Sequence, residues 1–307
     1  MDDHTLVVLG TSSQVPTRDR NHNGYFLKWG REGFLVDPGE GTQRRMTMAG
    51  VSASSITTIL ITHFHGDHCL GLPGVIQRLG LDRAEHEVEV IYPASGSGFY
   101  ECLRKSCQYK TVARLRERPV SGQGVVAVRQ EVSIEARRLW HSVETYGYRI
   151  QEPDSRTMLP ERLRAAGISG RDIGELKEKG QVTVQGRVHR VEDFSRVTPG
   201  RSAAFVLDTR PCSGAQELAR GVDLLLCEAT YLEAEAEQAA SYGHMTAAQA
   251  ARLARDSGAG QLVLSHYSPR YRDVHAFHEQ AGAIHARVVA ARDGSLVKMP
   301  KKVRELT

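Results

Sequence analysis

Three imidazoles and one carboxylate are crowded into six residues of this chain, in the segment HFHGDH that runs from His63 to His68. If they were buried together, protonated imidazoles would repel one another and each would lose its hydration. A bound metal ion removes both costs, because neutral imidazole and carboxylate are good ligands. His63 and His65 can project to the same side of the backbone and chelate one ion, while Asp67 and His68 turn toward a second. The segment therefore predicts a metal site.

The elements that must position these side chains are short runs of aliphatic and β-branched residues, punctuated by Gly, Asp or His. Such runs are typical of buried strands. They are Thr5–Leu9, Phe34–Val36, Ile56–Ile61, Val88–Tyr92, Ala204–Leu207, Val222–Cys227 and Gln261–Leu264. Helical stretches lie between them, most plainly Thr246–Arg255, where alanines recur at helical spacing before a Ser-Gly stop. Strands that alternate with helices predict an α/β fold.

Four polar residues stand just past the ends of these strands: His63, Asp208, Glu228 and His266. In α/β sheets, ligands bind outside the carboxyl ends of the strands. Taken singly, a polar residue in such a place commonly caps or hydrogen-bonds a loop. The sequence patterns leave both interpretations open for each residue alone.

Composition narrows the class of protein. The 307 residues carry 40 Lys and Arg against 36 Asp and Glu, and this net charge of +4 is too small to indicate a polyanionic partner by itself. The five cysteines show no CxxC or zinc-ribbon spacing, which favours a reducing cytosol over a disulfide framework. No stretch reaches the roughly 18 apolar residues of a membrane span, and no glycine-rich nucleotide loop occurs. We expect a soluble cytoplasmic protein that uses neither a membrane nor a nucleotide cofactor.

Residues 153–199 interrupt the alternation of strands and helices. The segment is poor in long aliphatic residues and carries nine Lys or Arg against seven Asp or Glu. Composition alone favours a solvated surface insertion, although long loops are also where function collects. Both interpretations remain open on the residues of the segment.

The pattern HxHxDH is the signature of the metallo-β-lactamase fold superfamily, and HFHGDH resembles it. Further matches follow in the superfamily's order at Asp37, His141, Asp208 and His266. The resemblance implies one αββα sandwich domain over residues 1–307, with 153–199 inserted as a flexible arm. It also implies two Zn²⁺ ions per subunit, with Mn²⁺ as the alternative. One ion is assigned to His63, His65 and His141 and the other to Asp67, His68 and His266, with Asp208 bridging both and Asp37 orienting a ligand histidine.

Within the superfamily, the chain resembles the tRNase Z (ribonuclease Z) family in its short bacterial form. LGTSSQVPTRDRN resembles that family's LGT start and PxKxRN loop, with Arg18 where Lys is usual. FLVDPGEGTQ resembles its DCGEGTQ motif, and CEATY and GHMTAAQA resemble its HEAT and HST motifs. The resemblance implies a homodimeric, cytoplasmic, zinc-dependent endoribonuclease that cleaves the 3′ trailer from precursor tRNA by two-metal hydrolysis and leaves a 3′-hydroxyl. It also implies that the 153–199 arm grips the tRNA elbow.

The resemblance assigns chemical roles as well. His244 is the general acid, Glu228 hydrogen-bonds it, and Asp67 takes a proton from the attacking water. Candidate substrate contacts beside the motifs are Arg18, Arg20, Asn21, Thr209, Arg210, Ser268 and Arg270. The alternative function is a hydrolase of the same fold that acts on small phosphodiesters or sulfate esters, which would have no use for the arm. A catalytically silent RNA-binding relative would have lost ligands, whereas all of them are present in this chain.

Overall fold

The computed structural model describes residues 4–108, 113–130 and 132–300. The chain divides into two compact units. The first is formed by the residues up to Ile150 and those from Ser202 onward, and the second by Gln151–Arg201. No helix in the described ranges is long and apolar enough to cross a membrane.

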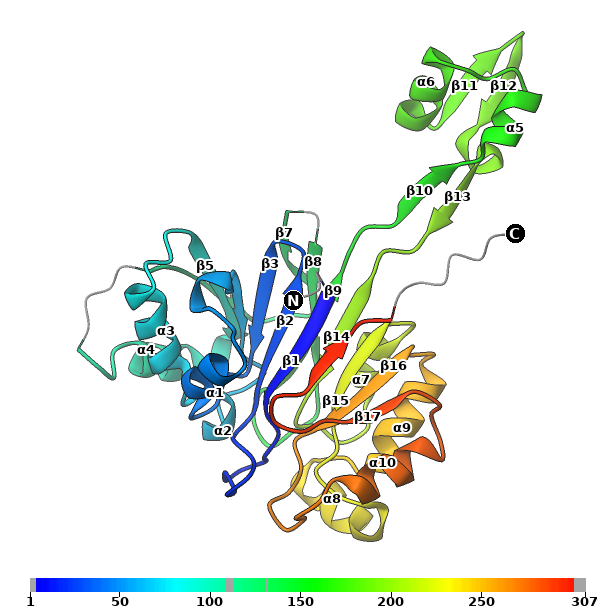
Figure 1. The fold of residues 1–307 in the computed structure, drawn as a ribbon. Helices are drawn as coiled ribbons and strands as arrows, with labels where there is room; N and C mark the ends of the chain where they lie inside the picture. Colours follow the sequence, from blue (N-terminus) through cyan, green and yellow to red (C-terminus); the bar gives the residue numbers. More distant parts are fainter. Residues whose placement is uncertain (1–3, 109–112, 131, 301–307) are drawn as a thin grey trace. The chain divides into compact units, whose positions relative to one another are not determined.

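The first unit contains two seven-stranded sheets (Figure 1). The first sheet consists, in spatial order, of β18 (Leu296–Lys298), β1 (His4–Gly10), β2 (Gly24–Trp29), β3 (Glu32–Val36), β4 (Thr58–Leu60), β5 (Glu87–Pro93) and β6 (Arg114–Val120). The second consists of β17 (Val288–Ala290), β16 (Gln261–Ser265), β15 (Leu224–Glu228), β14 (Ser202–Val206), β9 (Tyr146–Gln151), β8 (Val132–Arg138) and β7 (Gly124–Arg129). Strands β3 to β6 and β14 to β17 are parallel within their sheets, so each group ends at one edge.

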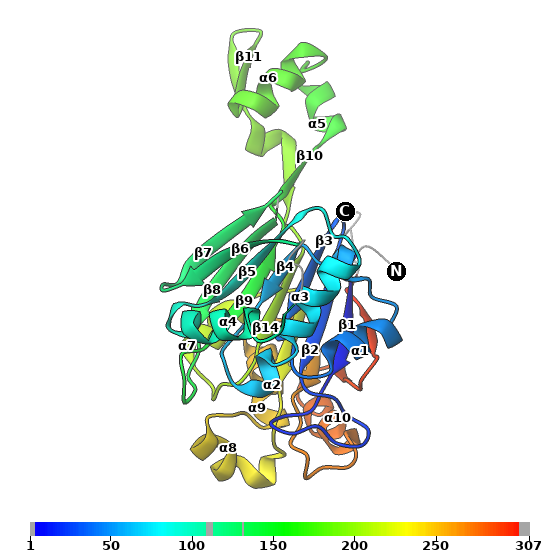
Figure 2. The same cartoon turned by 90° about the vertical axis from the view of Figure 1, so that its left-hand side faces the viewer.

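Helices cover the outer face of each sheet (Figures 1 and 2). Those of the first half are α1 (Thr42–Met48), α2 (Gly66–Cys69), α3 (Leu72–Leu81) and α4 (Ser97–Arg104). Those of the second half are α7 (Ser213–Ala219), α9 (Ala247–Asp256) and α10 (His275–Gly282), while α8 (Ala236–Tyr242) lies beyond the ends of the strands. Three short 3₁₀ turns are η1 (Ala53–Ser55), η2 (Ala94–Gly96) and η4 (Glu233–Glu235).

Side chains alternate between two cores along the strands. In β1, Leu6 and Val8 pack between the sheets, whereas Val7 and Leu9 pack with residues of the helices on the outer face. A third core, which includes Val206 and Leu225, lies under the helices of the second half. Both faces of the central strands are therefore buried, which explains why these strands are rich in aliphatic residues. This four-layer αββα arrangement confirms the predicted α/β fold class.

The predicted strands correspond to β1, β3, β4, β5, β14, β15 and β16. The predicted helix is α9, and Thr246 is its N-cap. The Thr246 side chain accepts the Gln249 backbone N–H, and the Gln249 side chain accepts the Thr246 N–H, so two backbone donors at the helix start are satisfied. Among the strands of the two large sheets, the sequence patterns do not predict β2, β6 to β9, β17 or β18.

The second unit has regular structure and its own small core. Strand β10 (Ser155–Met158) pairs antiparallel with β13 (Ser195–Thr198), and β11 (Gln181–Val184) forms a hairpin with β12 (Arg187–Arg190). Between them lie α5 (Pro160–Ala165), α6 (Arg171–Lys179) and the 3₁₀ turn η3 (Val191–Phe194). The core residues are Leu163, Ile168, Leu176, Val182 and Val191. Apolar side chains spaced through the segment thus fold it locally, which its overall polar composition does not reveal.

Candidate metal centre

Both sheets contribute ligand-bearing loops to one site in the first unit. His63, His65 and His68 lie between β4 and the end of α2, and His65 is the N-cap of that helix. From the other sheet, Asp208 follows β14 and His266 follows β16 directly. His141 follows β8 and Asp67 lies in α2, which completes the set of predicted ligands. The fold therefore brings the predicted ligands His141, Asp208 and His266, which are far apart in the sequence, to the predicted ligands of HFHGDH.

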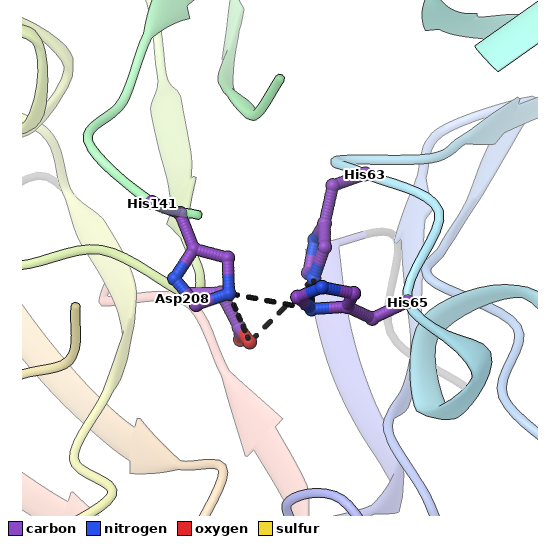
Figure 3. Close-up of side chains that lie close together, drawn as sticks. All are labelled: His63, His65, His141 and Asp208. Atoms are coloured by element: carbon purple, nitrogen blue, oxygen red, sulfur yellow. Dashed lines mark hydrogen bonds and ion pairs between the residues drawn. The ribbon is translucent and has the colours of Figure 1, made fainter. Parts of the chain in front are cut away.

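Four of these side chains form the first group: His63, His65, His141 and Asp208 (Figure 3). His63 Nε2 lies 3.1 Å from His65 Nδ1, which lies 3.3 Å from His141 Nε2. Asp208 Oδ2 lies 3.6 Å from His63 Nε2 and 3.7 Å from His141 Nε2. The nitrogens and the carboxylate oxygen point toward one another in Figure 3. These are donor atoms that converge on one point, as ligands of a metal ion do.

The second group uses the other oxygen of the same carboxylate. Asp208 Oδ1 lies 3.2 Å from His68 Nε2 and 3.0 Å from His266 Nε2. Asp67 Oδ2 lies 3.3 Å from His68 Nε2 and 3.5 Å from His266 Nε2. The two groups thus share Asp208, one oxygen each. Although Asp208 Oδ1 is buried near two imidazoles, it has no partner in hydrogen-bonding geometry within the described residues.

The protonation of the first group suits metal binding. Burial lowers the pKa of His63 well below its ordinary value, and burial also lowers the pKa of His65 and His141. These imidazoles are therefore neutral and can donate a nitrogen lone pair. His141 Nδ1 donates to the Gly243 carbonyl oxygen at 3.1 Å, which leaves Nε2 for an ion.

The second group holds protons when no cation is bound. Burial opposes a charge on His266, but the Asp208 carboxylate outweighs burial and raises the pKa of His266 to about 10. Burial would likewise raise the pKa of Asp208, but the His266 and His68 imidazoles hold it well below its usual range. A divalent cation would replace these protons as the positive charge among the carboxylates, so metal binding here releases protons.

The backbone conformation is unusual at three residues that follow the ends of parallel strands. Asp37, Asp208 and His266 have positive φ angles of 46°, 44° and 63°, in the left-handed region that residues with a Cβ rarely adopt. Each directly follows, or lies two residues after, the end of a parallel strand. The turn aims the side chain back over the strand ends, where the ligands meet. Such conformations persist where the surrounding structure enforces them, and they cluster at functional sites.

A buried carboxylate, Asp37, is connected by hydrogen bonds to one histidine of each group, directly to one and through a buried threonine to the other. Thr62 Oγ1 donates to Asp37 Oδ2 at 2.6 Å and accepts from His63 Nδ1 at 3.0 Å. The Asp37 carboxylate also accepts from His68 Nδ1 at 2.7 Å. Asp37 is therefore placed to orient ligands of both groups, one directly and one through the Thr62 hydroxyl.

A second threonine, Thr230, makes the equivalent pair of hydrogen bonds, to a carboxylate and to a histidine, in the other half of the fold. Thr230 Oγ1 donates to Glu228 Oε2 at 2.7 Å and accepts from His266 Nδ1 at 2.8 Å. The same Glu228 carboxylate accepts from His244 Nδ1 at 3.0 Å and from the Met245 backbone N–H at 3.1 Å. Each hydroxyl fixes the tautomer of its histidine, because Nδ1 must carry the proton and Nε2 the lone pair.

We expect that replacing Thr230 by valine weakens metal binding about 10- to 100-fold, the usual cost of losing a partner that orients a ligand. Valine has the shape of threonine but can neither accept a hydrogen bond from His266 Nδ1–H nor donate one to Glu228. Competition with a chromophoric zinc chelator measures the affinity. Thr230→Ser, which keeps the hydroxyl, is the matched control and should bind like the parent chain. Equal affinity of the valine and serine variants would show that the hydroxyl does not orient the ligand.

Sequence reasoning missed the two threonines and two further contacts to Asp67. The Gln14 backbone N–H donates to Asp67 Oδ2 at 2.9 Å, and Asn23 Nδ2 donates to the same oxygen at 3.4 Å. The only sequence signal for the two threonines is their position at a motif. Thr62 directly precedes HFHGDH, and Thr230 lies in CEATY. One partner of each threonine, Asp37 for Thr62 and His266 for Thr230, follows a distant strand, so these pairs form only in the folded chain.

Several candidate substrate contacts hold loops of the site in place. Arg20 is buried, and its guanidinium donates to the carbonyl oxygens of Tyr271 at 2.7 Å and Ser268 at 3.1 Å. Asn21 Nδ2 donates to the Glu40 carbonyl oxygen at 2.8 Å. Their contacts tie the loop before β2 to neighbouring segments, and their roles toward substrate stay predictions.

The remaining candidates differ in exposure. Thr209 is fully buried, and its backbone N–H donates to Glu228 Oε1. Arg18 and Arg270 are exposed, and Arg270 lies 5.0 Å from the centre of the Tyr231 ring. Arg210 is partly exposed. The arginines with accessible surface are the ones that can reach a phosphate group.

Comparison with known proteins identifies relatives over nearly the whole chain. Two family models match, one described as Anti-Pycsar protein Apyc1 over residues 4–118 and one as Beta-lactamase superfamily domain over residues 190–267. Ribonuclease Z of Nocardia farcinica is 51% identical over 304 residues, which cover 98% of this chain and 100% of the relative. Ribonuclease Z of Chlamydia muridarum is 44% identical over 296 residues, 96% of this chain and 97% of the relative.

Solved structures share the fold. The human tRNase Z, short form, superposes with a TM-score of 0.70 at 24% identity and covers 97% of this chain and 100% of its own. The metallo-beta-lactamase fold protein YhfI from Bacillus subtilis superposes with a TM-score of 0.68 at 16% identity and covers 96% and 98%. The αββα sandwich described above is therefore the metallo-β-lactamase fold, as the HxHxDH resemblance implied.

Proposed function

Because this chain belongs to the ribonuclease Z family, we propose that it is an endoribonuclease that cleaves the 3′ trailer from precursor tRNA and leaves a 3′-hydroxyl. The observation that carries the proposal is the convergence of imidazole and carboxylate donors in two groups that share Asp208. Such an arrangement serves hydrolysis of a phosphodiester, whose transition state gathers negative charge between two cations.

Two Zn²⁺ ions, or Mn²⁺ in their place, fit these groups. Tetrahedral zinc with bonds of about 2.0–2.1 Å sets its donors about 3.3–3.4 Å apart, and the pairs of donor atoms that are in direct contact here are separated by 3.0–3.7 Å. The Asp208 oxygen without a hydrogen-bond partner supports the same assignment. His63, His65 and His141 would hold one ion, and Asp67, His68 and His266 the other, with Asp208 between them. When bound, the ions polarise the phosphoryl oxygens and neutralise developing charge.

The chain's own residues supply the proton transfers. His244 is buried, and its Nδ1 is hydrogen-bonded to Glu228, so Nε2 is the nitrogen that can give a proton to the leaving 3′-oxygen. Burial opposes the charged form, but the Glu228 carboxylate outweighs it and raises the pKa of His244. His244 therefore keeps its proton to higher pH than a free histidine. Asp67, at the second metal group, is the residue we assign to accept a proton from the attacking water.

A change of Glu228 to glutamine should move the pH profile of cleavage. Glutamine carries no charge, so the pKa of His244 falls, and the general acid loses its proton at a lower pH. The rate of cleavage should then begin to fall at lower pH than in the parent chain, in addition to a general loss. His244→Ala should lower kcat by about 10²- to 10⁴-fold, the usual contribution of a general acid. Cleavage rates between pH 6 and 9 test both expectations, and an unshifted alkaline limb in Glu228→Gln would refute the pairing.

We propose that the second unit binds the tRNA. Its described surface carries exposed basic side chains, among them Arg162, Arg164, Arg171, Lys177 and Arg187. With acidic residues interspersed, the unit would contact a few phosphates and recognise the shape of an RNA helix, as proteins usually do with double-stranded RNA. The role follows from the family resemblance of the 153–199 segment and from this exposed positive charge.

The resemblance also leads us to propose a homodimer that acts in the cytoplasm. Sedimentation equilibrium measures the assembly state directly, and a monomer at micromolar concentration would contradict the proposed dimer.

The proposed activity is tested by incubating the chain with one precursor tRNA that bears a 3′ trailer, and by mapping the product end. Cleavage at the 3′ side of the acceptor stem, with a free 3′-hydroxyl, is expected. His65→Ala removes one ligand of the first group and is the negative control. Cleavage elsewhere in the RNA, or cleavage that survives exhaustive chelation, would refute the proposal.

A further inference from the structure

An exposed tryptophan and an arginine stack on each other at the edge of the metal centre. Trp140 immediately precedes the ligand His141, and Arg210 lies two residues after the ligand Asp208. The Arg210 Cζ atom lies 3.2 Å from the centre of the Trp140 ring. The pair therefore joins the two loops that bring ligands from β8 and β14.

The backbone holds this stack in place. The Trp140 N–H donates to Thr209 Oγ1 at 3.0 Å, and the Arg210 N–H donates to the Trp140 carbonyl oxygen at 3.3 Å. Gly243, in the loop that carries His244, lies so close that a Cβ there would be 3.3 Å from Trp140 Cζ3. Three loops of the site thus meet at the indole ring.

Both side chains keep solvent-accessible surface in the folded chain. The chain has two tryptophans; Trp29 is 3% exposed, whereas Trp140 is 44% exposed. Arg210 keeps accessible surface too, and no carboxylate of the described ranges forms an ion pair with its guanidinium. A planar cation on an exposed aromatic ring is a surface on which another flat group can stack.

We propose that Trp140 and Arg210 form a stacking subsite for a nucleobase of the RNA, in the nucleotide next to the cleaved phosphate. This inference rests on the proposed function. Unpaired bases stack on aromatic rings and on guanidinium planes, and they do so with little dependence on sequence. Because Trp140 is the chain neighbour of a ligand, a base stacked there belongs to a nucleotide beside the reacting group. Stacking would hold the RNA strand so that one phosphate, and not the next, lies at the metal centre.

The test compares one variant with the parent chain on each of two RNAs. The first RNA is a trailer-bearing precursor tRNA, and the second is the same molecule with abasic residues on both sides of the cleaved phosphate, which keeps every phosphate. Trp140→Ala should lower kcat/KM about 5- to 150-fold on the first RNA, the usual worth of one stacked base. On the abasic RNA the variant should equal the parent chain. The quantity to compare between the variant and the parent chain is the ratio of kcat/KM on the two RNAs. Because both values come from the same protein preparation, a partial loss of metal lowers them equally and leaves the ratio unchanged.

Equal losses on the two RNAs would overturn the stacking subsite. Arg210→Lys keeps the charge and loses the plane, so it should behave like Trp140→Ala; full activity of the lysine variant would show that Arg210 contacts a phosphate instead. Arg31→Gln, in the turn before β3 at the end away from Asp37, is the matched control and should be unchanged.

Tryptophan fluorescence gives a second readout that needs no cleavage. Because Trp29 is buried, quenching on RNA binding reports Trp140, and the Trp140→Phe chain supplies the background. Quenching by the base-bearing RNA, and none by the abasic RNA, is expected. If the parent chain binds with this pattern and cuts nothing, the subsite stands and the proposed activity fails. If it cuts and shows the same quenching with both RNAs, the activity stands and the subsite fails.

Discussion

Asp208→Ala should lose the two metal ions that we propose for this site and nearly all turnover of precursor tRNA. Asp208 supplies one oxygen to each group and is the only anion between them among the described residues. Without it, two cations would repel each other at short range. Metal ions supply several kcal/mol of transition-state stabilisation, so kcat should fall about 10³-fold or more, since each 1.36 kcal/mol is tenfold in rate.

The metal content of the purified chain, measured by plasma mass spectrometry, checks the first half of this expectation. Asp256→Ala removes an exposed carboxylate at the end of α9 and should leave content and rate unchanged. Asp208→Asn, which keeps the shape and one oxygen, should retain less metal than the parent chain. Two ions per chain in Asp208→Ala would show that the carboxylate does not bridge.

Replacing residues 153–199 by a short Gly-Ser linker should abolish efficient tRNA processing while small phosphodiesters are still hydrolysed. The ends to be joined are close, because β9 and β14 are neighbours in their sheet and the Glu152 N–H donates to the Arg201 carbonyl oxygen at 2.9 Å. The core of the second unit is formed by its own residues, so its removal leaves the sandwich cores intact. Loss of two charge-assisted contacts, at roughly 1.5 kcal/mol each, lowers kcat/KM by about 100-fold.

Steady-state kinetics on precursor tRNA and on bis(p-nitrophenyl) phosphate separate the two expectations. The deletion should also flatten the salt dependence of tRNA binding, because fewer phosphates are neutralised. Unimpaired tRNA processing by the deletion would remove the arm from the mechanism. Loss of both activities, with normal metal content, would mean that the unit supports the active site itself.

Most of the fold was predictable where a strand is buried on both faces. ITTILI and VDLLLC consist mainly of aliphatic residues because β4 and β15 are covered by helices on one side and by the other sheet on the opposite side. Strands β7 and β8 were not predicted because one of their faces is largely uncovered, and β6 was not predicted because most of its side chains are exposed. In VSIEARR, Ile134 and Ala136 point into the core between the sheets, and Glu135 lies on the other face. Alternation of period two was the available signal.

The candidate site was predictable to the extent that its chemistry is local. HFHGDH places three imidazoles within six residues, so this segment predicts a metal site without knowledge of the fold. His141 and His266 have no other predicted ligand near them in the sequence. They were predicted as ligands only because the order of motifs matches that of the resembled family. Thr62 and Thr230 act through hydrogen bonds whose partners come from other strands, Asp37 after β3 for one and His266 after β16 for the other. No spacing in the sequence encodes those pairs.

The left-handed backbone at Asp37, Asp208 and His266 has a cost in folding stability. Each such conformation costs on the order of 1–3 kcal/mol and persists where the surrounding packed structure enforces it. Each of the three residues follows a strand whose side chains are buried on both faces. Glycine would adopt this conformation without strain, but it would remove the side chain. The chain therefore gives up some folding stability at three positions in order to aim three polar side chains at the candidate metal centre.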